Sequence, residues 1–269
     1  LLLFSIAKWG ITLRSKNFAL VGVCFVAIAP ALVQLRADYV LELPLTASIS
    51  FTIWILGRWL NTSDGGKWWQ AILAALFTTC SLLIKQSALL ILAPAFIYII
   101  FIIPKKKISI LLQLFSGIAV ILTGILPWFK HNWITTISGT NRAVIESAAL
   151  EGDPQLFTLD NWLWYPRLIP EQIGTIIFLI GISGIFFWVI RLKRTSNNSF
   201  KETLLDDYAS WRWLVFVLLS SWLLTTITPN KDERYIAPLI PFVVLTLSRG
   251  WWEWSIWLKY KSKTNKKSQ

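Results

Sequence analysis

The sequence predicts an all-α fold, a polytopic transmembrane helical bundle of about eight spans. Of its 269 residues, 55% are hydrophobic, and the mean hydropathy is +0.58. Soluble domains are usually about 45–50% apolar, and here the excess lies in runs close to the ~20 residues that a helix needs to cross a bilayer. The formal charge of +12 falls in short clusters between these runs. A nucleic-acid surface would gather its charge on one face of a folded domain, so we expect no nucleic-acid partner.

The apolar runs define the elements in chain order. Residues 1–13 are too short to span and predict the end of a helix; because the chain opens in an apolar stretch and contains no Met, we expect an amino-terminal truncation. The runs that follow predict spans at about residues 18–35, 44–60, 68–84, 88–103, 108–128, 172–190, 212–228 and 236–258. They form one transmembrane domain over residues 1–258, and residues 259–269 form a basic cytoplasmic tail.

Basic residues mark alternate connections between these spans. The basic clusters are Arg14 with Lys16, Arg58 with Lys67, Lys105–Lys107, Arg191–Arg194 and the tail. The positive-inside rule assigns them to the cytoplasm. The remaining connections then share the outer side and hold most of the sequence of mixed charge: residues 36–43, 85–87, 129–171 and 229–235. We therefore expect the functional site on the outer side.

The turn over residues 36–43 carries Arg36, Asp38 and Glu42 between two apolar runs. Ionisable residues at a membrane boundary are costly and are candidates for function. If the segment is helical, the two carboxylates share a face. A carboxylate here can act as a general base on an acceptor, the pair can hold a divalent cation, or both can be a solvated loop edge paired with Arg36. Spacing alone does not separate these alternatives.

Two further outer segments carry candidate residues. Lys85 lies between two closely joined spans, where an ammonium suits an anionic phosphate or serves as a snorkelling anchor. Lys231, Arg234 and Tyr235 lie in a dense turn with two acids. Arg234 can fork onto a phosphate or a carboxylate, and the alternative is an ordinary hairpin between spans. Aromatics in the long 129–171 connection are typical of interfacial anchors, or of a stacking platform for a sugar.

These three segments resemble motifs of the GT-C glycosyltransferases, in particular the protein O-mannosyltransferase and aminoarabinose transferase group. Arg36-x-Asp38-Tyr39-x-Leu41-Glu42-x-Pro44-Leu45 is similar to that group's second acidic motif, with Glu42 where the group often has Asp. Leu83-Ile84-Lys85-Gln86 resembles its short lysine turn. Lys231-x-x-Arg234-Tyr235-x-x-Pro238-x-x-Pro241 resembles its late basic segment. The likeness follows the chain order through most of the sequence.

The resemblance implies an integral-membrane enzyme that moves a sugar from a polyprenyl-phosphate carrier to a lipid, polysaccharide or protein acceptor. It implies a site facing the periplasm or exterior of a bacterial plasma membrane. Asp38 and Glu42 would be the supporting acids, acting on the acceptor, the donor or a divalent cation, and the main catalytic acid would precede Leu1. Substrate contacts are expected from Arg36, Lys85, Lys231, Arg234 and Tyr235.

Two other classes remain open at this point. A transporter or flippase for a lipid-linked or anionic substrate would carry charged or broken helices at mid-membrane depth. The predicted spans instead have their charges gathered at one boundary, which favours the enzyme. A structural membrane subunit would have loops that are only solvated.

Overall fold

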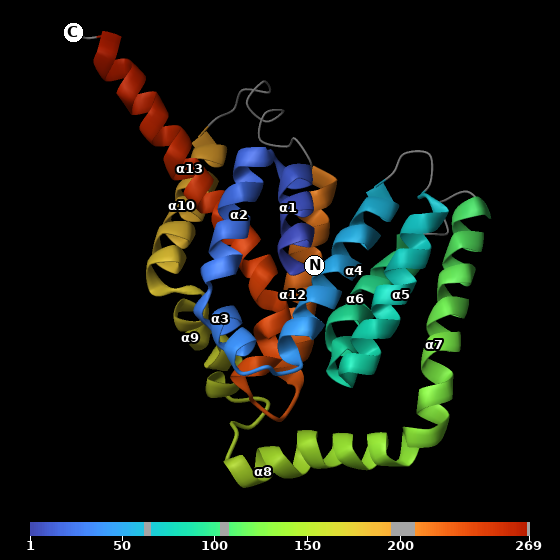
Figure 1. The fold of residues 1–269 in the computed structure, drawn as a ribbon. Coiled ribbons are helices and arrows are strands. Elements are labelled where there is room, and N and C mark those ends of the chain that lie inside the picture. The colour runs from blue at the N-terminus through green and yellow to red at the C-terminus, as the bar shows by residue number, and fades with distance from the viewer. Residues whose placement is uncertain (62–65, 103–107, 195–207, 268–269) are drawn as a thin grey trace.

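The computed structural model describes residues 1–61, 66–102, 108–194 and 208–267, and within these ranges the chain consists of helices joined by turns and short loops, without a strand (Figure 1). The predicted all-α class is confirmed. The elements are α1 Leu2–Leu13, α2 Lys16–Ile28, α3 Pro30–Ala37, α4 Glu42–Asn61, α5 Trp68–Ile84, η1 Gln86–Ala88, α6 Leu89–Ile102, α7 Ile108–Asn141, the π-helical turn η3 Arg142–Glu146, α8 Ser147–Glu151, α9 Leu159–Ile173, α10 Thr175–Arg194, α12 Tyr208–Ile227, η4 Glu233–Leu239 and α13 Ile240–Lys267.

Three described helices are long and apolar enough to cross a membrane, fewer than the eight spans expected. They are Glu42–Asn61, Ile108–Glu151 and Ala209–Ile227. The number rises to five if the bent pairs α2–α3 (52°) and α9–α10 (113°) each count as one span. Two expected spans are short: α5 has 17 residues and α6 has 14, about 26 and 21 Å at 1.5 Å per residue, against a hydrocarbon core of about 30 Å.

Most of the described helices reverse direction from one to the next, while α3 continues α2 toward the same end, as the colours of Figure 1 show. The segments 38–41, 85–88 and 228–239 lie at the lower end in that view, which we call the site end. At the opposite end the Trp211 indole donates to the Leu13 carbonyl oxygen, at 3.2 Å. The basic turn at Arg14 and Lys16 therefore lies at the end remote from Glu42 and Lys85.

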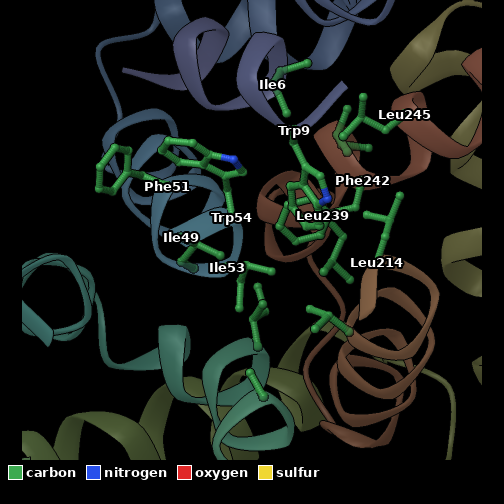
Figure 2. Packing of buried hydrophobic residues seen from close by; sticks show 14 of the residues in the cluster. Ile6, Trp9, Ile49, Phe51, Ile53, Trp54, Leu214, Leu239, Phe242 and Leu245 are labelled. Atoms are coloured by element: carbon green, nitrogen blue, oxygen red, sulfur yellow. The ribbon is translucent and has the colours of Figure 1, made fainter. Parts of the chain in front are cut away.

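A buried apolar core fixes the helices relative to one another. Figure 2 shows side chains of α1, α4, α12 and α13 meeting around Trp9, Ile53 and Leu214. Trp9 packs edge-on against Phe242, with ring centroids 5.4 Å apart, and the Trp213 indole donates to the Ile53 carbonyl at 2.9 Å. Between helices in a bilayer, such contacts stabilise the bundle through van der Waals packing. The core thus gives the loops at the site end a rigid support.

Helices α10 and α13 run parallel and approach each other through glycines. A Cβ on Gly184 would overlap the backbone of Gly250, and a Cβ on Gly250 would overlap the carbonyl oxygen of Gly181. Small residues let helix backbones come this close. The pair is joined further up by Trp254, whose ring stacks on Phe187 with centroids 5.3 Å apart.

The connection expected over residues 129–171 is largely helical instead of a loop. Helix α7 continues to Asn141 and turns sharply at the site end (Figure 1). Gly124 still packs on Thr79 of α5, and Pro127 follows, which removes a helical hydrogen bond and is a usual cause of a kink. Beyond it, residues 128–151 run across the site end; we call this segment the cross limb. Its polar residues Asn132, Thr136 and Thr140 repeat at helical spacing. In the sequence, the charged residues of this connection make that helical pattern hard to recognise.

Candidate functional site

The centre of the candidate site is an ion pair between Glu42, at the start of α4, and Lys85, at the end of α5. Glu42 is the first residue of α4, is only 5% exposed, and accepts a hydrogen bond from Lys85 Nζ at 2.6 Å. The helix N-terminus carries a partial positive charge that favours a carboxylate there. Lys85 ends α5 in an extended conformation (φ −158°, ψ 129°), so its side chain leaves the helix axis. A buried charge needs a partner, and Glu42 therefore holds the Lys85 ammonium in one place.

Tyr235 supplies the other contact of Lys85. The Lys85 ammonium lies 5.1 Å from the centroid of the Tyr235 ring, within the range of a cation–π interaction. Burial raises the pKa of the Tyr235 hydroxyl, and Asp232 adds to the effect. The hydroxyl therefore stays protonated at neutral pH and can donate a hydrogen bond to an anion.

A cavity of about 610 Å³ opens beside this pair. That volume falls in the range of ligand pockets, roughly 300–1,000 Å³. One wall is the turn Lys85–Ser87, and the facing wall is the cross limb, with Asn132, Thr136 and Thr140. Leu89, Leu90 and Trp128 form an apolar side. The cavity thus offers one cation, a row of uncharged polar groups, and an apolar surface.

A smaller cavity of about 140 Å³ lies near the other side of the 231–235 turn. Its lining includes Asp38, Glu171 and Arg234. Arg234 binds Asp232 through Nε at 2.9 Å and Nη2 at 2.5 Å. Burial acts to raise the pKa of Asp232, but the hydrogen bonds from Arg234 outweigh it and the pKa is lowered. The Arg234–Asp232 pair is therefore charged at neutral pH.

The two predicted acids do not share a helix face. Helix α3 ends at Ala37, Asp38 caps it, and Tyr39 has a positive φ of 53°. Asp38 is exposed at the smaller cavity, while Glu42 is buried against Lys85. Among the described residues there is no group of three or more Asp, Glu, His or Cys side chains that could hold a metal ion. Asp38 and Glu42 do not present a common pair of oxygen ligands in this arrangement, and we derive no step through a metal.

The remaining predicted substrate contacts lie apart from the large cavity. Arg36 is exposed in the last turn of α3. Lys231 is 4% exposed, and its ammonium donates to the carbonyls of Thr226 and Thr228 at 2.5 and 2.6 Å. The Lys231 ammonium therefore satisfies carbonyl oxygens at the carboxyl end of α12. Lys231 lines neither cavity. Of the residues expected to bind substrate, Lys85 and Tyr235 meet at the large cavity, and Arg234 at the small one.

The buried Lys231 makes stability depend on pH in a defined direction. Burial lowers its pKa from 10.5 to about 8, opposed in part by Asp153. Below pH 8 both the folded and the unfolded chain hold the proton; between about pH 8 and 10.5 the unfolded chain holds more of it, so folding is favoured as pH rises. We expect the stability of the wild type, relative to Lys231→Met, to rise by up to about 3 kcal/mol across this window. Thermal unfolding in lipid nanodiscs from pH 7 to 10 measures it, and a pH-independent difference between the two proteins contradicts it.

Sequence reasoning missed two features that the structure brings out. Thr136 and Thr140 of the cross limb, four and eight residues after Asn132, form one helical face with it, and that spacing is the signal in the sequence. Arg249 and Glu253, also four apart, form an ion pair inside α13 at 2.5 Å, with both side chains almost fully buried. The sequence predicts that the span over 236–258 is nearly free of charge, and this buried ion pair corrects that expectation.

Comparisons with known proteins found no relative of this chain. No protein-family model matches the chain, and neither the curated proteins nor the solved structures contain a match.

Proposed function

We propose that this chain is part of an integral-membrane glycosyltransferase that transfers a sugar from a polyprenyl-phosphate carrier to an acceptor on the outer side of the membrane. The observation that carries the proposal is the large cavity beside Lys85, at one end of an apolar helical bundle. In this proposal the eight apolar runs each cross the membrane, with α5 and α6 as short spans. The basic end faces the cytoplasm, and the site end faces the periplasm or exterior of a bacterial plasma membrane.

The cavity suits a lipid phosphate in charge and in polarity. Lys85 has three donor hydrogens, and Glu42 engages one of them. Protein kinases likewise hold a phosphate-binding lysine in position with a glutamate. Leu89 is 56% exposed at the apolar side of the cavity. An isoprenoid chain can follow this surface toward the bilayer while its phosphate remains at Lys85.

The proposed reaction is a displacement at the anomeric carbon. An oxygen or nitrogen of the acceptor forms a bond to this carbon, and the bond from the carbon to the phosphate oxygen breaks. The electron pair leaves with the polyprenyl phosphate, whose charge is stabilised by Lys85 and the Tyr235 hydroxyl. The proton of the acceptor passes to a carboxylate. No carboxylate lines the large cavity, and Asp38 lines the smaller one; in this proposal the acceptor therefore approaches the anomeric carbon from the side of the smaller cavity, where Asp38 takes its proton, and Glu42 acts as a positioning residue for Lys85.

The first test is Asp38→Asn in the full-length protein. We expect sugar transfer to fall about 100-fold, because a positioned general base contributes about 10²–10⁴, while binding of the carrier is unchanged. Asp160→Asn is the matched control: Asp160 is an exposed acid near the same end, paired with Arg167 at 3.0 Å and lining neither cavity. Transfer at the wild-type rate by a correctly inserted Asp38→Asn protein would remove the proposed role of Asp38.

A transporter or flippase for a lipid-linked or anionic substrate is the second candidate. It is favoured by the breaks between α2 and α3 and between α9 and α10, and by the ion pair inside α13, since transporters use broken helices and charges within their spans. Liposomes containing a fluorescent polyprenyl phosphate separate the two functions. The enzyme is expected not to accelerate movement of the lipid between leaflets, whereas a flippase accelerates it without any acceptor.

A further inference from the structure

The wall that the cross limb contributes to the large cavity carries a row of hydroxyl groups. Most threonines packed inside the bundle donate to the carbonyl four residues earlier, namely Thr46, Thr52, Thr79, Thr225, Thr226 and Thr246, whereas the buried Thr78 hydroxyl has no partner. Within the described part of the chain, the hydroxyls of Thr135, Thr136 and Thr140 have no hydrogen-bond partner, and all three residues line the cavity. Each hydroxyl can donate one hydrogen bond and accept two.

This row continues to Asn132 at the same helical spacing. The Asn132 side-chain nitrogen donates to the Trp128 carbonyl at 2.9 Å, which leaves its oxygen as an acceptor. Asn132, Thr136 and Thr140 extend over eight residues, about 12 Å along a helix. Gln86 and Ser87 lie on the opposite wall. A ligand between these walls meets uncharged donors and acceptors on both sides.

The formal charge on this cavity comes from a single residue. Of the described residues that line it, Lys85 is the one charged side chain, and none is a carboxylate. Glu42 is turned toward Lys85 and is not part of the lining. A second anionic group on the ligand would have no cation to meet, and an ammonium group would have no carboxylate. A charge that loses water and meets only uncharged groups is costly.

We propose that the cross limb selects the sugar, and that the donor carries an uncharged, hydroxyl-rich sugar on a single phosphate. Asn132, Thr136 and Thr140 are the specificity-determining residues. This inference rests on the proposed function, which supplies the carrier phosphate at Lys85, and adds to it the class of sugar and the residues that recognise it.

Gly139 allows the space between these residues to be filled without disturbing the fold. A Cβ at this position would meet no atom within 4 Å, and Gly139 lines the cavity between Thr136 and Thr140. Because glycine is unfavourable inside a helix, Gly139→Leu should stabilise the cross limb while its side chain occupies the sugar part of the cavity.

The experiment measures equilibrium binding to the protein in lipid nanodiscs, by competition with radiolabelled polyprenyl phosphate. The probes are polyprenyl phosphate without sugar, and the same lipid carrying glucose, glucuronate or glucosamine through its phosphate. We expect the glucose lipid to bind at least about 10-fold more tightly than either charged-sugar lipid. The double change Thr136→Val and Thr140→Val, and separately Gly139→Leu, should weaken the glucose lipid about 10-fold and change the sugar-free lipid less than about twofold.

Ser138→Ala is the control, because Ser138 lies on the same limb, donates to the Thr135 carbonyl and does not line the cavity; it should bind every probe as the wild type does. Preference for a charged sugar, or equal weakening of the sugar-free and glucose lipids by the threonine and Gly139 variants, overturns the sugar assignment alone. If the sugar-free lipid does not bind the wild type at all, the proposed function fails, and this inference fails with it.

Discussion

Replacement of Lys85 by Met is expected to lower sugar transfer by about 1,000-fold. Removing one positioned donor from a charge that develops in a transition state costs about 10²–10³ in rate, and Lys85 is the only charged residue among the described residues that line the large cavity. Methionine keeps a side chain of similar length, so packing against the Tyr235 ring is retained. Transfer from a polyprenyl-phosphate sugar in membranes containing the full-length protein measures the effect.

The variant also leaves Glu42 buried without its partner, which costs about 3–5 kcal/mol and could unfold the site end. The double change Lys85→Met with Glu42→Gln removes this penalty, because a neutral amide replaces the buried charge. We expect the double variant to recover the thermal stability of the wild type but not its transfer rate. Lys130→Met removes an exposed cation from the cross limb and should leave transfer unchanged. A stable double variant with transfer within tenfold of the wild type would exclude Lys85 from the proposed role.

Replacement of Gly250 by Ala is expected to destabilise the fold by about 3 kcal/mol or more, although alanine is the better helix former. The added methyl group would overlap the carbonyl oxygen of Gly181, so α10 and α13 must move apart. For a chain of this size, such a loss lowers the thermal midpoint by about 10 °C. Thermal unfolding of the protein in nanodiscs, followed by light scattering or by the signal of its 17 tryptophans, measures the change.

Gly139→Ala is the control for this prediction. It makes the same chemical change inside a helix at a position where the new Cβ meets no other atom within 4 Å, so it should raise stability by about 0.5–1 kcal/mol. A destabilisation of equal size at both positions would show that the effect comes from the helix itself and not from contact between α10 and α13. Gly184→Ala should behave as Gly250→Ala does, because its Cβ would overlap Gly250.

Much of the helical arrangement could be predicted from local patterns. The apolar run expected at 44–60 corresponds to α4, and the run at 68–84 corresponds to α5. Both follow from the length of the run and the polar residues that end it. Composition does not fix the number of membrane crossings, because a run of 17 residues lies at the lower limit of what spans a bilayer. Pro127 in the sequence indicates a bend in α7. No local pattern predicts the direction in which the cross limb runs after that bend.

The contacts of the site depend on packing between segments that are distant in sequence. Glu42 and Lys85 are joined because α4 and α5 lie antiparallel, held by the Ser48 hydroxyl on the Phe77 carbonyl at 2.9 Å and by the Ser81 hydroxyl on Ser48 at 2.8 Å. No local pattern near residue 42 indicates this partner. The same packing buries Glu42 and leaves Asp38 exposed, so two acids that looked equivalent in the sequence have different chemistry.

The sequence by itself determined that the chain forms apolar helices with acids and cations in three of their connections, because run length and charge act locally on the chain. Only the tertiary structure decided which of these charges meet, which remain in water, and which polar residues face the large cavity. The reason is physical: burial and ion pairing are properties of the space between helices, and that space exists only after α4, α5, α12 and the cross limb have packed.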